Sequence, residues 1–131
     1  MTEPLKIQIY YEDTDAAGVV YYANYLKYLE RARTELLSDI GVSIKDYHDT
    51  GYFFAVTHVD ISYMQPARLG DIISVTTETV EMRNASLKIK HRILRDGTPL
   101  AEALVTVACI NKNWKPVRLP EEFKRLKQAQ R

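Results

Sequence analysis

The sequence predicts an α+β domain in which a curved antiparallel sheet of about five strands wraps around one long helix. One segment, from about residue 22 to residue 40, repeats its apolar residues at steps of three and four, as an amphipathic helix does. Other segments alternate apolar and polar residues, or are continuously apolar, which is typical of strands. Short loops join the last four of these strands, so their neighbours should be antiparallel. The predicted strands cover residues 5–11, 53–64, 72–83, 86–95 and 99–111.

The first strand is predicted from Leu5, Ile7, Ile9 and Tyr11, which alternate with Lys6, Gln8 and Tyr10. This period of two gives the strand one buried face. Residues 12–20 follow as a turn, in which Gly18 is free to adopt a positive φ.

The long helix is predicted from a broad apolar face that is too wide to stay exposed to water. Gly41 follows it as a stop signal, and Ser43 can cap a short helical turn over residues 43–50. The face needs a sheet to cover it, which is the main reason for the predicted architecture. Its members are Tyr25, Tyr28, Leu29, Ala32, Leu36, Leu37 and Ile40.

The remaining connections follow from glycine and proline. Residues 65–71 contain both and form a loop, and Asp96-Gly97 is the signature of a hairpin turn. Residues 101–110 are apolar on both faces, as in a covered central strand, and the tail from Pro120 reads as a charged helix or a frayed end. One helix and one sheet leave sheet edges open, so we expect a homo-oligomer, either a dimer or a tetramer.

Composition restricts the classes of function. The chain has 131 residues, which form a single domain spanning residues 1–131, and 46% of them are hydrophobic. A net charge of +1 argues against nucleic-acid binding as the main activity. We expect no membrane span and no signal peptide, and hence a cytoplasmic protein.

Three common kinds of site are not indicated. His48, His58 and His91 lack the spacing of metal ligands, so no metal is expected. Cys109 lies in the most apolar strand and reads as a core residue rather than a nucleophile. No glycine-rich phosphate loop occurs, and we expect no cofactor.

Asp15 is a candidate catalytic carboxylate, because it lies just before a predicted helix start. Backbone N–H groups converge there and stabilise negative charge, so a carboxylate beside them could attack an acyl carbonyl. The alternative is an ordinary turn or cap residue.

Two other groups of side chains allow more than one interpretation. Lys88, Lys90 and Arg92 share one strand face and lie near Arg83, which predicts either a solvated surface or a landing site for a phosphorylated ligand. Six of the nine tyrosines, which fall within the first 28 residues, fit an interface, a pocket wall or ordinary core packing.

Residues 10–35, which read YYEDTDAAGVVYYANYLKYLERARTE, resemble the signature of hotdog-fold thioesterases. The similarity is to the 4-hydroxybenzoyl-CoA thioesterase family, and in particular to its YbgC-type, Tol–Pal-associated acyl-CoA thioesterase branch. It continues through residues 65–71 (QPARLGD), and the order of elements agrees over nearly the whole chain.

The resemblance implies a hotdog fold, an acyl-CoA substrate and active sites at a dimer interface. It gives the catalytic role to Asp15, the second Asp of the Asp-x-Asp motif. It gives the oxyanion role to the backbone N–H of Tyr22, seven residues later. The branch usually has histidine where this chain has Tyr22, which leaves a backbone donor intact but removes any role for the ring. We expect the substrate-contacting residues to be Val20, Arg83, Lys88 and Lys90.

The implied mechanism leaves two roles open for Asp15, attack on the thioester carbon or activation of a water. Two alternatives to hydrolysis also stand. A hotdog dehydratase would carry a histidine near the helix, and residues 12–40 contain none. A non-catalytic acyl-CoA or acyl-carrier binding protein would not need Asp15. The acyl group itself is left undetermined.

Overall fold

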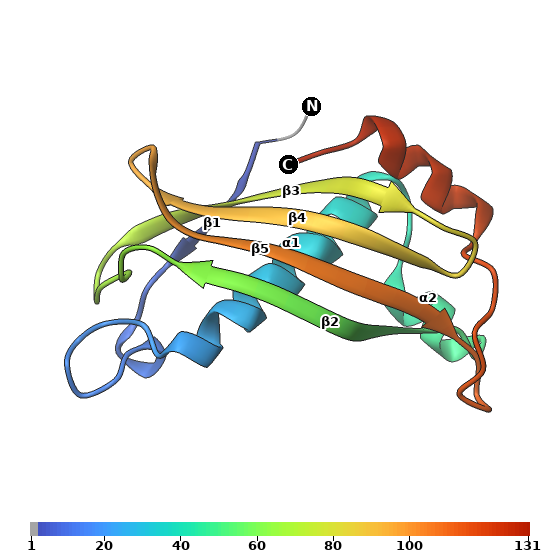
Figure 1. The fold of residues 1–131 in the computed structure, drawn as a ribbon, viewed down its shortest axis with the longest axis horizontal. Coiled ribbons are helices and arrows are strands. Elements are labelled where there is room, and N and C mark those ends of the chain that lie inside the picture. Colours follow the sequence, from blue (N-terminus) through green and yellow to red (C-terminus); the bar gives the residue numbers. More distant parts are fainter. Residues whose placement is uncertain (1–2) are drawn as a thin grey trace.

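A computed structural model describes residues 3–131 as one five-stranded antiparallel sheet and one long helix (Figure 1). The strand order is β1-β3-β4-β5-β2. The strands are β1 (Leu5–Gln8), β2 (Phe53–Tyr63), β3 (Ile72–Met82), β4 (Ser86–Arg95) and β5 (Thr98–Ile110). The helices are α1 (Tyr25–Asp39), α2 (Ile44–Asp49) and the short 3-10 helices η1 (Tyr11–Asp13), η2 (Tyr22–Asn24) and η3 (Glu121–Gln128).

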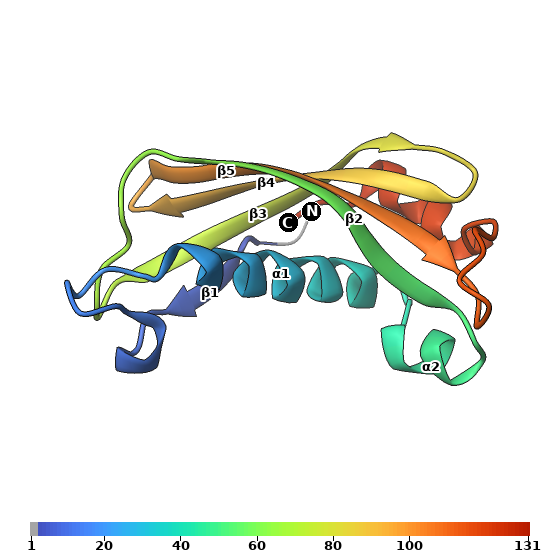
Figure 2. The same cartoon turned by 60° about the horizontal axis from the view of Figure 1, so that its bottom comes forward.

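The sheet curves over α1, which lies along its concave side (Figure 2). Tyr28, Ala32 and Leu36 of α1 are almost completely buried, and so are Val75 and Val105 on the facing strands. Burial of this much apolar surface is the main stabilising contribution to such a domain. The predicted hotdog architecture is therefore confirmed.

The ends of α1 are set by local chemistry. The predicted start at residue 22 holds only as a 3-10 turn, η2, before the α-helix begins at Tyr25. At the other end Gly41 has φ +84° and donates its N–H to the Ser38 carbonyl, as predicted for a helix stop.

The first strand is shorter than predicted, because β1 ends at Gln8. The Asp13 carboxylate accepts the Tyr10 N–H at 2.8 Å and folds residues 11–13 into η1. Tyr11 is consequently exposed rather than on the buried face. A side chain that competes for a backbone N–H ended the ladder earlier than periodicity indicated.

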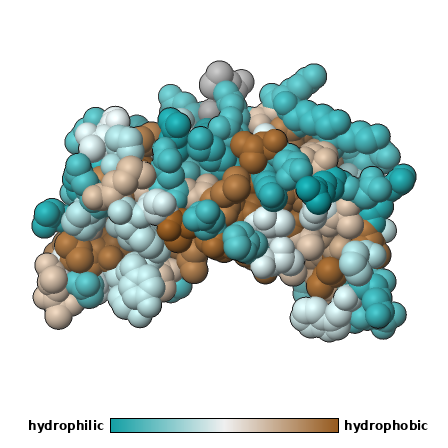
Figure 3. Space-filling model, viewed as in Figure 1, coloured by the Kyte–Doolittle hydropathy of each residue, from teal (hydrophilic) through white to brown (hydrophobic). Residues whose placement is uncertain are grey.

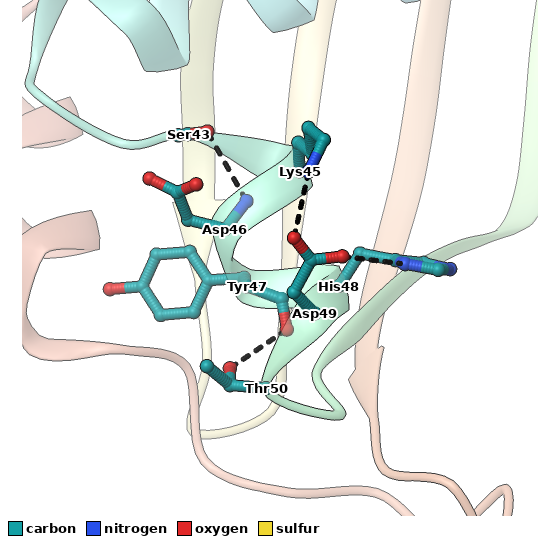
Figure 4. A network of polar contacts seen from close by, with 7 residues as sticks. All are labelled: Ser43, Lys45, Asp46, Tyr47, His48, Asp49 and Thr50. Carbon is teal, nitrogen blue, oxygen red and sulfur yellow. Dashed lines mark hydrogen bonds and ion pairs between the residues drawn. The ribbon is translucent and has the colours of Figure 1, made fainter.

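The short helix α2 forms where Ser43 was expected to cap it. Ser43 Oγ accepts the Asp46 N–H at 3.2 Å, and Lys45 pairs with Asp49 at 2.8 Å (Figure 4). The Tyr47 hydroxyl donates to Glu122 on η3, which connects α2 to the C-terminal segment. That segment is not frayed, because Phe123 and Leu126 of η3 are buried in the core.

The two edges of the sheet differ. Past the end of β1, the same edge of β3 pairs with the C-terminal residues. Thr77 and Arg131 exchange two backbone hydrogen bonds there, of 2.7 and 2.9 Å. The Arg131 guanidinium also donates to both Asp39 oxygens, at 2.8 and 2.9 Å, and so ties this segment to α1. No strand of the described part of the chain pairs with the outer edge of β2.

Replacing Arg131 by alanine is expected to lower the free energy of unfolding by about 1–2 kcal/mol, because a bidentate, part-buried ion pair is lost. Arg92→Ala is the matched control. Arg92 pairs with Glu102 at 3.2 Å on an exposed surface, and its loss should cost less than about 0.5 kcal/mol. Denaturant titration of both variants is the measurement, and equal losses would contradict the assignment.

Candidate active site

The turn between β1 and α1 is a small closed loop that carries Asp15. The Asp15 N–H donates to the Val19 carbonyl at 2.9 Å, and the Asp15 carbonyl accepts the Gly18 N–H at 3.0 Å. Gly18 has φ +79°, a conformation that residues with a Cβ rarely adopt. Thr14 forms a β-bridge with Val20, so the turn closes immediately before the helix start.

The two aspartates of this turn have different surroundings. Both Asp13 oxygens accept hydrogen bonds, one from the Tyr10 N–H and one from the Asn24 side chain at 2.9 Å. Asp15 is exposed, and within residues 3–131 only its Oδ1 accepts a hydrogen bond, from the Ala17 N–H at 2.8 Å. Asp13 is thus a structural residue, whereas Asp15 keeps one oxygen available for chemistry.

The turn is docked on the loop 65–71, the second segment that the sequence singled out. The Val20 N–H donates to the Ala67 carbonyl at 2.8 Å, and the Leu69 N–H donates to the Gly18 carbonyl at 3.1 Å. The loop is itself held by Asp71, which pairs with Arg95 at 2.6 Å. Two segments about fifty residues apart in sequence are therefore hydrogen-bonded to one another next to Asp15.

The start of the helix offers an unused donor. No acceptor among the described residues pairs with the Tyr22 N–H, as is usual for the first turn of a helix. The Tyr22 carbonyl accepts the Tyr63 hydroxyl at 2.9 Å, and the Tyr25 hydroxyl accepts the Ala67 N–H at 3.1 Å. Tyr63 thus holds the peptide group at the helix start, and Tyr25 ties the helix to the loop 65–71.

A hollow of about 250 Å³ adjoins this helix start, and Val20, Tyr22, Tyr25 and Tyr63 line part of it. Burial raises the pKa of Tyr63, with a further contribution from Tyr25, so its hydroxyl stays protonated and can keep donating. Tyr63 was not identified from the sequence, because its partner Tyr22 is 41 residues away. The tyrosines divide between two predicted roles: Tyr25 and Tyr28 are buried in the core, whereas Tyr21 and Tyr22 remain exposed.

The basic residues lie elsewhere in the structure. Arg83 and Lys88 both pair with Glu81, at 3.1 and 3.4 Å, where β3 and β4 meet. The turn that carries Asp15 is docked on the loop 65–71, which leads into β3, and the segment between β1 and α1 lies at the opposite end of the sheet from the β3–β4 turn (Figures 1 and 2). Lys90 lines two shallow surface hollows. The structure therefore places Val20 and Tyr22 along one hollow, with Asp15 in the turn that precedes them, and leaves the basic residues apart.

The fold and this turn define a class of protein. Residues 10–126 match the family model described as the thioesterase-like superfamily, and the chain belongs to that family. No helix within residues 3–131 is long and apolar enough to cross a bilayer.

Two named relatives are similar to most of this chain. The chain is 39% identical over 120 residues to a protein of Haemophilus influenzae named acyl-CoA thioesterase YbgC, covering 90% of this chain and 88% of that protein. It is 41% identical over 119 residues to the acyl-CoA thioester hydrolase YbgC of Escherichia coli, covering 89% of each.

Solved structures agree on the fold. A hypothetical protein from Thermus thermophilus is 30% identical, with a TM-score of 0.88 over 97% of this chain and 98% of its own. A 1,4-dihydroxy-2-naphthoyl-CoA thioesterase from Synechocystis has a TM-score of 0.89 over 96% and 95% of the two chains. At 24% identity, the second likeness concerns the fold alone.

Proposed function

We propose that this protein hydrolyses acyl-CoA thioesters to a free acid and CoA. The observation that carries the proposal is an exposed Asp15 carboxylate with an unshared oxygen in a turn closed by Thr14 and Val20, followed two residues after Val20 by the helix-start N–H of Tyr22, for which no acceptor is found among the described residues. The names of the relatives at 39% and 41% identity support the same substrate class.

The chemistry follows from these two groups. The Tyr22 N–H donates to the thioester oxygen and stabilises the negative charge that develops there. Asp15 either attacks the carbonyl carbon, forming an anhydride that water later hydrolyses, or takes a proton from a water that attacks in its place. In both routes the carbon–sulfur bond breaks, CoA leaves as a thiolate, and the thiolate is then protonated.

The open edge of β2 supports a homodimer. It spans eleven residues, contains no proline or lysine, and exposes Val56 and Tyr63. Such an edge is a template for strand pairing. Antiparallel pairing of two β2 strands over their full length places the twofold axis near His58, the central residue.

The same symmetry offers a role for the distant basic residues. A twofold axis at the middle of β2 exchanges the two ends of the sheet, so Arg83 and Lys88 of the partner subunit come to the end that carries Asp15. There they hold the CoA phosphates, with Lys90 beside them.

A hydrophobic band also crosses the exposed face in Figure 3, between more hydrophilic regions, and offers a surface for pairing dimers into a tetramer.

Release of CoA from a panel of acyl-CoAs, followed with a thiol-reactive dye, tests the proposal. The protein itself should give little background, because Cys109 is its only cysteine and is fully buried. Turnover of some panel members is expected. Binding of acyl-CoA without any release would instead favour the non-catalytic alternative. Light scattering on the same sample should give at least twice the monomer mass of 15.1 kDa.

A further inference from the structure

A second, more enclosed pocket lies between the later turns of α1 and the concave face of the sheet. Its volume is about 150 Å³, and its walls are mainly apolar, with Leu37, Val56 and Val107 among them. Ile44 of α2 and Phe123 of η3 also line it. A dry cavity of about this size in another protein holds benzene, so one aromatic ring or a chain of five or six heavy atoms would fill it.

One charged group in this apolar pocket is held in an unusual way. Arg33 lines the pocket, and its Nη1 lies 3.3 Å from Nε2 of His91, which is completely buried. His91 Nδ1 lies 3.1 Å from the Thr76 carbonyl, which can only accept, so Nδ1 carries the proton and Nε2 accepts from Arg33. Burial, and then the charge of Arg33, lower the pKa of His91 to about 3, so the imidazole is neutral.

Arg33 is therefore a part-buried cation that is held by a neutral partner. No carboxylate among the described residues lies within ion-pair distance of it. Glu30, which also lines the pocket and attracts the guanidinium electrostatically, accepts the Thr34 hydroxyl at 2.9 Å. A desolvated guanidinium with free N–H groups is costly unless an anion or a hydrogen-bond acceptor meets it.

The position of the pocket relative to Asp15 follows from the proposed dimer, on which this inference rests. Along η2 and α1 of one chain, Arg33 is about 17 Å beyond Tyr22, too far for a short acyl group. Pairing of two β2 strands about His58 places Tyr63 of the partner subunit opposite Phe53. The hollow at the partner's helix start then adjoins this pocket, next to Phe54 and Val56.

We propose that this pocket receives the far end of the acyl group, and that Arg33 selects acyl groups ending in a carboxylate or a hydroxyl. The apolar walls hold the body of the acyl group, and the guanidinium pairs with the terminal oxygen. Arg33 is thus a specificity-determining residue for substrates of about five carbons or one ring. His91 orients it without neutralising its charge.

Size-matched substrate pairs test this assignment. One pair is glutaryl-CoA, which ends in a carboxylate, and pentanoyl-CoA, which does not. The other pair is 4-hydroxybenzoyl-CoA, which ends in a hydroxyl, and benzoyl-CoA, which does not. For wild type, kcat/KM should be higher for the member of each pair that carries the terminal oxygen. Arg33→Met should lower the ratio of the two kcat/KM values by about tenfold or more, since charge-assisted hydrogen bonds are lost. Arg33→Lys, which keeps the charge but not the planar fork, should give an intermediate ratio.

Arg31→Met is the matched control, because Arg31 is exposed on the same helix, and its ratio should equal that of wild type. Circular dichroism checks that each variant is folded. A wild-type preference for the apolar member, or an unchanged ratio in Arg33→Met, overturns the selectivity while leaving hydrolysis intact. If no substrate is turned over, the hydrolase proposal fails instead. The ratio of dissociation constants from calorimetry on the same pairs then decides the role of Arg33.

Discussion

Asp15→Asn is expected to lower kcat/KM toward every acyl-CoA substrate by about 10²–10⁴-fold, the usual contribution of a general base, with a loss at least as large for a nucleophile. Asparagine keeps an oxygen that can accept the Ala17 N–H, so the closed turn should persist. The charge and the nucleophilic oxygen are lost. Initial rates of CoA release at several substrate concentrations measure the effect.

Glu12→Gln is the control for this experiment. Glu12 is exposed in the same segment, and its replacement removes one negative charge without touching the turn that Asp15 closes. Its kcat/KM should stay within about twofold of wild type, as expected for a surface substitution. If Asp15→Asn retained wild-type turnover, the catalytic role would belong to another group.

The stability of the protein should fall as the pH is lowered below about 6.5, and His91 should account for much of the loss. Its pKa is about 3 in the folded protein and near 6.5 when unfolded. Between these values the unfolded chain binds a proton that the native protein does not. The contribution of His91 is therefore fully present above pH 6.5 and is lost at up to about 1.4 kcal/mol per pH unit below it.

Denaturant titrations between pH 7.5 and pH 5 measure this slope. They should be run at one protein concentration, because a dimer is stabilised by its own concentration. His91→Gln should be less stable at pH 7.5 and should show a shallower slope. His48→Gln, which changes an exposed histidine, should keep the wild-type slope. The buried-histidine explanation would be wrong if the slopes of wild type and His91→Gln were the same.

The order of elements could be predicted from the sequence because hydrophobic periodicity is a local property. The apolar face of α1, the stop at Gly41 and the cap at Ser43 all depend on residues within a few positions of one another. The prediction failed where a local competitor intervened: the Asp13 carboxylate took the Tyr10 N–H and ended β1 early.

The candidate site was predicted only in part. The Asp15 turn was found because its residues are contiguous. The hydrogen bond from Tyr63 to the Tyr22 carbonyl joins residues 41 apart, and the contact between Arg33 and His91 joins residues 58 apart. Neither pair leaves a periodic or spacing signal in the chain.

The sequence alone therefore determined which elements form and which carboxylates stand before the helix. Only the tertiary structure decided that Asp13 is used up in structural hydrogen bonds while Asp15 keeps a free oxygen. It also decided that Arg83 and Lys88 meet at Glu81 beside the β3–β4 turn, whereas the Asp15 turn is docked on the loop that leads into the other end of β3. The physical reason is that elements form from local preferences, whereas hydrogen-bond partners and distances across a sheet depend on how those elements pack.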